Sequence, residues 1–137
     1  MNRTDFQTLS ELRLQESKAL LAAGLPDGAY YLAGYAIECA FKACIAKRTR
    51  QHDFPEKGSN RYFSHDLEDL SGFAKLKLEL DQALQANPAL NTNWTIILNW
   101  SEESRYKQGK TAQDVTDLLT AIEDQTGGLL PWLRQRW

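Results

Sequence analysis

Apolar residues recur every three to four positions along most of the chain, which is the period of an α-helix with one buried face. Strand-like alternation is nearly absent, and residues 51–64, which contain Pro55, Gly58 and Asn60, have the composition of a loop. The pattern predicts helices at 4–23, 27–48, 75–87 and 92–106, a short helix beginning with HDLEDL, and a last helix after Thr111. We therefore expect an all-α fold, an antiparallel up-and-down bundle of four to five helices in one domain spanning 1–137.

Helix ends are marked by residues that break or cap a helix. Gly24 and Pro26 separate the first two predicted helices, and Pro88 follows the end of the helix at 75–87. Thr111 and Asp114 have the spacing of a capping box, so a helix is expected to begin directly after Thr111.

The second predicted helix raises the main question of this sequence. Residues 28–46 carry only two charged side chains, Glu38 and Lys42, so the segment should be buried. A buried carboxylate is costly unless it is paired. Tyr31, Tyr35, Glu38 and Lys42 are spaced four, three and four residues apart and therefore share one stripe of the helix. Small residues on its other faces allow close approach of another helix, from the same chain or from a second copy.

Two partners for Glu38 are open at this point. Glu38 and Lys42 can pair with each other on a half-exposed rim, which is worth about 0.3 to 0.5 kcal/mol. Alternatively, Arg105 can reach Glu38 from the end of the helix predicted at 92–106, because arginine suits partly buried, bidentate pairing. Arg105 can also simply cap the carbonyl groups of its own helix.

Composition places the chain among ordinary globular proteins. Hydrophobic residues make up 42% and charged residues 25%, well above the hydrophobic content of disordered chains. The first residues are too polar for a signal peptide, and charges in the middle of 28–46 argue against a membrane span, so a cytoplasmic protein is expected. Cys39 and Cys44 point about 140° apart on one helix and are expected to be buried thiols, not a disulfide.

The net charge of −2 is unevenly distributed. Residues 42–61 hold six basic and two acidic side chains, whereas residues 62–104 hold two basic and seven acidic ones. A basic segment at the end of a helix can bind phosphate, or its cations can simply complement the helix dipole. No glycine-rich phosphate loop, zinc-protease motif, zinc-spaced cysteine set or nucleophile elbow occurs, so neither a metal site nor a cofactor is predicted. No membrane-binding helix is predicted either.

Three segments, AGYAIECAFKACIAK, HDLEDL and WSEESRY, follow one another on this helical layout. In this combination the chain, from about residue 13 to residue 133, resembles the HEPN domain, a family of higher eukaryotes and prokaryotes named for nucleotide binding. The resemblance implies a bundle of about five helices, often a homodimer, with a cleft facing nucleotide or RNA. It also implies a possible partner, because small members are frequently paired with a minimal nucleotidyltransferase in toxin–antitoxin or phage-defence modules.

Ribonucleases of that family carry an arginine followed by a histidine after four to six intervening residues. Arg105 matches the arginine, but no histidine follows it, and both His52 and His65 lie upstream. Arg61 precedes His65 by too few residues and lies in the wrong segment. His65 can begin the HDLEDL helix and pack there, or it can approach Arg105 in space and serve as an acid–base group.

Three functions follow, and the first is favoured. It is a non-catalytic, HEPN-like module that binds a nucleotide, RNA or a partner protein. Its ligand-binding candidates lie on the second helix and near its proposed guanidinium partner: Tyr31, Tyr35, Glu38, Lys42, Arg105 and Tyr106. The second is a metal-independent ribonuclease that uses His65 and Arg105 as catalytic residues. The third is a structural homodimer in which Glu38, Lys42 and Arg105 form a buried network.

Overall fold

A computed structural model describes residues 1–49 and 64–137 of the chain. Every regular element in these residues is a helix, so the predicted all-α bundle is confirmed. In chain order they are α1 (Arg3–Ala22), α2 (Pro26–Lys47), α3 (Leu67–Phe73), α4 (Lys77–Ala86), α5 (Pro88–Leu98), the 3-10 helix η3 (Glu102–Tyr106), α6 (Ala112–Glu123) and α7 (Leu129–Arg134). The predicted loop at 51–64, apart from Ser64, lies outside the described residues, as do His52 and Arg61.

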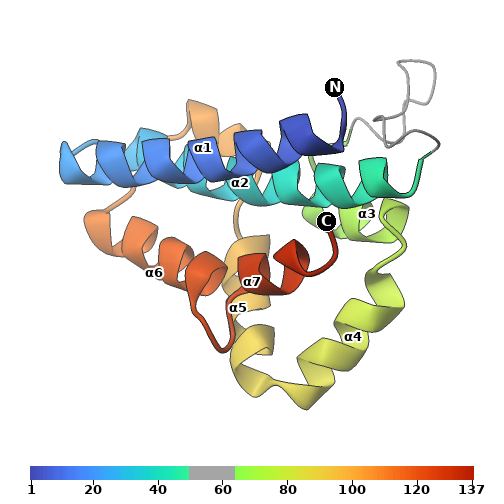
Figure 1. The fold of residues 1–137 in the computed structure, drawn as a ribbon. Coiled ribbons are helices and arrows are strands. Elements are labelled where there is room, and N and C mark those ends of the chain that lie inside the picture. Colours follow the sequence, from blue (N-terminus) through green and yellow to red (C-terminus); the bar gives the residue numbers. More distant parts are fainter. Residues whose placement is uncertain (50–63) are drawn as a thin grey trace.

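Helices α1 and α2 form a long antiparallel hairpin along one side of the molecule (Figure 1). The turn between them uses Gly24 at φ +76°, a left-handed conformation that favours glycine. Two buried serines of α1 donate hydrogen bonds to carbonyl groups of α2, Ser10 to Ala36 at 2.7 Å and Ser17 to Ala29 at 2.6 Å. The small residues of α2 therefore allow close approach of α1 from the same chain.

Helices α3, η3, α6 and α7 lie against α2, with α6 and α7 near one another, while α4 leads away from α3 toward α5 (Figure 1). Helix α2 is consequently covered on most sides, and Ala33, Ile37 and Phe41 are fully buried. Phe41 meets Trp94 of α5 edge-on, with ring centroids 6.1 Å apart. The apolar core thus surrounds α2, as its sequence predicts, and any polar group on α2 must be paired or directed to the surface.

One predicted helix is wrong. The pattern predicted a single helix at 92–106, but α5 begins at Pro88, after the N-cap Asn87, and ends at Leu98. The chain then turns, and residues 102–106 form η3. The turn brings the Trp100 ring against Gly34 of α2, where its Nε1 donates a hydrogen bond to the Tyr31 carbonyl at 3.2 Å. Burial of this indole outweighs continuation of the helix.

The predicted capping box at Thr111 is confirmed. The Thr111 hydroxyl accepts a hydrogen bond from the Asp114 backbone N–H at 3.1 Å, and the Asp114 carboxylate accepts one from the Thr111 N–H at 2.9 Å. These contacts begin α6 and lower the pKa of Asp114, chiefly through the hydrogen bond from the Thr111 backbone. In the described ranges, no helix combines the length and apolar character that crossing a membrane requires.

Candidate functional site

The carboxylate of Glu38 is fully buried and lies between the side chains of Lys42 and His65. Its Oε1 accepts hydrogen bonds from Lys42 Nζ at 2.8 Å and from His65 Nδ1 at 2.9 Å. Its Oε2 is buried and has no hydrogen-bond partner among residues 1–49 and 64–137. The predicted pairing of Glu38 with Lys42 is therefore present, but in a buried setting, since Lys42 is only 8% exposed and does not form a half-exposed rim.

His65 comes from the segment just before α3 and bridges two carboxylates. Its Nδ1 faces Glu38, and its Nε2 lies 3.1 Å from Oε2 of Glu102 in η3. An ionised carboxylate only accepts, so both ring nitrogens donate when the imidazole is protonated. The helix that follows is fixed by Asp66, whose side chain accepts a hydrogen bond from the Asp69 N–H at 2.9 Å. His65 thereby connects α2, α3 and η3.

A surface cavity of about 550 Å³ opens beside His65. Its lining is made of polar and acidic residues, namely Ser64, His65, Asp66, Ser101, Glu102 and Glu103. Three carboxylates around one imidazole disfavour a phosphate group at this position. In the residues that the structure describes, no group of histidine, cysteine and acidic side chains is arranged to hold a metal ion.

Arg105 is not the partner of Glu38, and this prediction is wrong. Its guanidinium is exposed and lies 4.8 Å from the centroid of the Tyr106 ring. The pKa of Arg105 is raised, first by Tyr106 and then by interaction with the Tyr31 phenol. Burial of Trp100 against Gly34 sets the start of η3 beside Tyr31, which lies about 10 Å along the helix from Glu38. His65, not Arg105, supplies the distant partner of the buried carboxylate.

The two tyrosines of the predicted stripe form a short aromatic row with Trp100. Tyr35 stacks on Tyr31 with centroids 5.9 Å apart, and Tyr31 stacks on Trp100 at 6.1 Å. Burial, together with nearby acidic groups, raises the pKa of Tyr35 to about 12, so its phenol stays protonated at neutral pH. Tyr106 extends from this row into solvent and is 76% exposed. Tyr31, Arg105 and Tyr106 are thus brought together, and we name them the Arg105 cluster.

Two of the residues that shape the site were missed. Glu102 was counted only as part of an acidic segment, although it faces the second nitrogen of His65. Gly34 was not singled out, although a Cβ there would lie 2.2 Å from the Trp100 ring. A lone glycine in an apolar helix was the available signal, since it marks close approach of another group.

Both cysteines are buried and free, as expected. Burial raises the pKa of each thiol to about 12, so neither is a thiolate nucleophile at neutral pH.

The chain matches no family of known proteins, no curated protein and no solved structure in the comparisons made with it. The proposed function therefore rests on the geometry of the Arg105 cluster and of the contacts around Glu38.

Proposed function

We propose that the chain is a non-catalytic, HEPN-like binding module that takes a nucleotide or single-stranded RNA on the Arg105 cluster. The observation that carries the proposal is the exposed guanidinium of Arg105 over the exposed ring of Tyr106, next to Tyr31. Aromatic faces stack on bases, and a guanidinium holds phosphate in a bidentate manner. The aromatic row behind them, anchored by Trp100, supplies a rigid support.

Titration calorimetry with a short oligoadenylate that lacks a terminal phosphate tests this proposal. We expect Tyr106→Ala and Arg105→Gln each to weaken binding about tenfold. The matched controls are Leu78→Ala, which also removes a highly exposed apolar side chain, and Arg134→Gln, which removes an exposed arginine that pairs with Glu11. Lack of binding to the unaltered protein, or equal losses in the controls, would refute the nucleotide-binding role.

The partner part of the proposal rests on the resemblance alone. A homodimer would have to use surfaces other than the small-residue face of α2, because Ala29, Ala33 and Ala36 are fully buried within one chain. Light scattering of the purified protein measures its oligomeric state. A minimal nucleotidyltransferase is the proposed protein partner, and co-purification with such a protein encoded beside it is the corresponding test.

A second candidate, a metal-independent ribonuclease, is favoured by one contact. Glu38 holds Nδ1 of His65 and directs Nε2 toward a surface cavity, as a general base requires. His65 would take the 2′-OH proton as that oxygen attacks phosphorus, and would return a proton to the 5′ oxygen as its bond to phosphorus breaks, which leaves a 2′,3′-cyclic phosphate. Glu102 opposes this role, because its carboxylate occupies Nε2.

Cleavage of RNA in the presence of a chelator separates the two functions. The ribonuclease predicts that His65→Ala abolishes cleavage and that Glu102→Gln, which removes the competing charge, increases it. The binding module predicts no cleavage by the unaltered protein or by either variant.

A further inference from the structure

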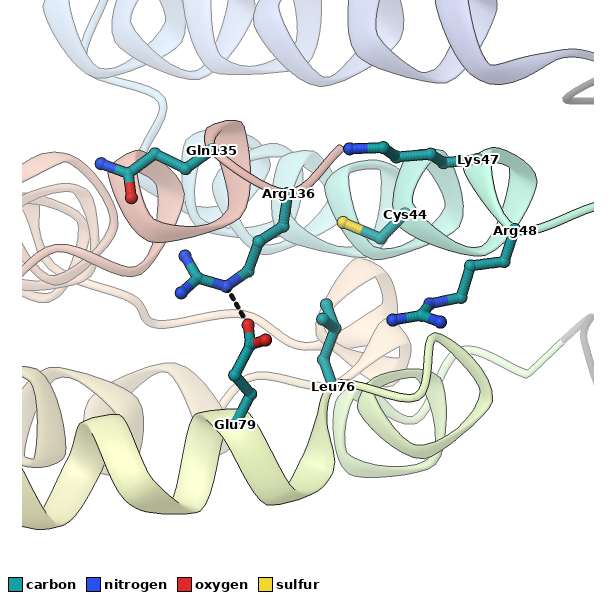
Figure 2. A pocket seen from close by; sticks show the side chains of 7 residues that line it. All are labelled: Cys44, Lys47, Arg48, Leu76, Glu79, Gln135 and Arg136. Carbon is teal, nitrogen blue, oxygen red and sulfur yellow. Dashed lines mark hydrogen bonds and ion pairs between the residues drawn. The ribbon is translucent and has the colours of Figure 1, made fainter.

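A second cavity, of about 360 Å³, lies at the C-terminal end of α2, and three of its seven lining residues are cations. It is formed by the end of α2, the start of α4 and the segment after α7: Cys44, Lys47, Arg48, Leu76, Glu79, Gln135 and Arg136 (Figure 2). Three cations and one carboxylate leave an excess of positive charge, whereas the whole chain has a net charge of −2. The cavity lies about 25 Å along α2 from Tyr31, so it is distinct from the Arg105 cluster.

The three cations line one cavity from distant parts of the sequence. In Figure 2 the side chains of Arg48 and Arg136 flank Leu76, with Cys44 beside them. Burial raises the pKa of the Cys44 thiol, and the positive charges of Lys47, Arg136 and Arg48 act against that rise. Lys47, Arg48 and Arg136 all line the cavity that Cys44 borders.

Arg136 is held in position before any ligand arrives. Its guanidinium lies 3.8 Å from the centroid of the Trp132 ring, its Nη1 donates to the Trp132 carbonyl at 2.9 Å, and its Nε pairs with Glu79 (Figure 2). Within residues 1–49 and 64–137, its Nη2 has no hydrogen-bond partner. A guanidinium fixed on one side with donors left on the other is suited to a bidentate anion.

Lys47 and Arg48 are exposed, and no carboxylate in the described part of the chain pairs with them. They are also not needed to complete the end of α2. The carbonyl of Ile45 accepts from the Arg48 N–H at 3.0 Å, and that of Ala46 accepts from the Thr49 N–H at 3.1 Å. The side chains of Lys47 and Arg48 are therefore not needed as donors to these carbonyl groups. Their charges can complement the helix dipole while their N–H groups bind a ligand.

We infer that this cavity binds a small molecule bearing a phosphate monoester. Its volume is at the lower end of the range for small-molecule sites and exceeds what a lone phosphate fills. The three cations take the phosphate, and Leu76 with the Cys44 thiol offers an apolar wall to the rest of the molecule. Glu79 competes with the phosphate for Arg136.

Calorimetry at constant ionic strength with glucose 6-phosphate tests the inference, with glucose and gluconate as uncharged and carboxylate counterparts. We expect binding of glucose 6-phosphate only. Lys47→Gln and Arg48→Gln should each weaken it about tenfold. The matched controls are Lys18→Gln, which lies toward the far end of α1, and Arg134→Gln, whose side chain pairs with Glu11; both should leave binding unchanged.

Glu79→Gln tests whether Arg136 takes part in binding. A purely structural role of Arg136 predicts no gain in affinity from this substitution. Removal of the competing carboxylate should tighten binding several-fold while the exposed helix start remains folded, as circular dichroism can verify. Absence of binding, equal binding of gluconate, or binding that Lys47→Gln and Arg48→Gln leave intact would overturn the inference. Because nucleotide binding at the Arg105 cluster uses other residues, Tyr106→Ala should not alter the result.

Discussion

Two polar clusters lie near one stripe of α2, and they differ in how far water reaches them. Around Glu38, a fully buried carboxylate is met by Lys42 and His65, and His65 is met by Glu102. Around Arg105, a cation and the Tyr106 ring stand in solvent beside Tyr31. The first cluster pairs its charged groups with one another and ties three elements together, whereas the second leaves donors and an aromatic face for a ligand. Stability and binding should therefore respond to different substitutions.

The largest effect is expected from Glu38→Ala. This change leaves Lys42 without its buried counter-charge and removes the acceptor of His65 Nδ1, so we expect a loss of about 4 kcal/mol in the free energy of unfolding. Urea denaturation measures it. Glu103→Ala is the control. It removes an exposed carboxylate from the cavity beside His65 and should lower the free energy of unfolding by less than about 0.5 kcal/mol. Similar losses in both variants would mean that Glu38 is not held in a buried network.

Gly34→Ala should destabilise the packing of Trp100 against α2, at a position between Tyr31 and Glu38. A Cβ there would overlap the Trp100 ring, which must move and take the start of η3 with it, at a cost of about 3 kcal/mol. Gly72→Ala is the matched control, because a Cβ at that helical position meets nothing within 4 Å and alanine favours the helix. Thermal unfolding of both variants distinguishes them, and an unaffected Gly34→Ala would show that Trp100 does not pack as described.

His65→Ala should have an intermediate effect. The imidazole is partly exposed, so its loss is expected to cost about 1.5 kcal/mol. Glu102→Gln, which alters only the outer partner of His65, should cost about 0.5 kcal/mol. Losses of unfolding free energy in the order Glu38, His65, Glu102 would agree with their contacts, since Glu38 is fully buried, His65 faces two carboxylates and Glu102 faces only His65. The reverse order would place the energetic centre of the network at the surface.

Arg105→Gln and Tyr106→Ala should have the smallest effect on stability. Both side chains are exposed, so neither substitution should measurably shift the midpoint of urea denaturation. The same preparations should bind the oligoadenylate about tenfold more weakly, which calorimetry can follow. A large loss of stability would show that the Arg105 cluster is part of the core.

Much of the fold follows from the hydrophobic period, and the buried stripe of α2 was visible in the spacing of its polar residues. The break after Leu98 was not, because the residues from Trp94 to Tyr106 keep a helical pattern while the Trp100 indole is drawn out of it by Gly34. The local hydrophobic period carries no information about a packing partner more than sixty positions away in the chain.

The partner of Glu38 was missed for a related reason. Arginine is the residue best suited to meet a buried carboxylate, so the residue type favoured Arg105. The geometry is decided by where η3 begins and by the segment before α3, which presents His65 to Glu38 at 2.9 Å. A sequence offers candidates for such a pair, but the choice between Arg105 and His65 depends on the turns that carry them.

A double-mutant cycle tests the central claim most directly. Glu38→Gln is combined with His65→Ala in one cycle and with Arg105→Gln in another, and the unfolding free energies of all variants are measured in urea. We expect a coupling energy of about 1 kcal/mol or more between Glu38 and His65, and none between Glu38 and Arg105. Coupling to Arg105 in the absence of coupling to His65 would contradict the account.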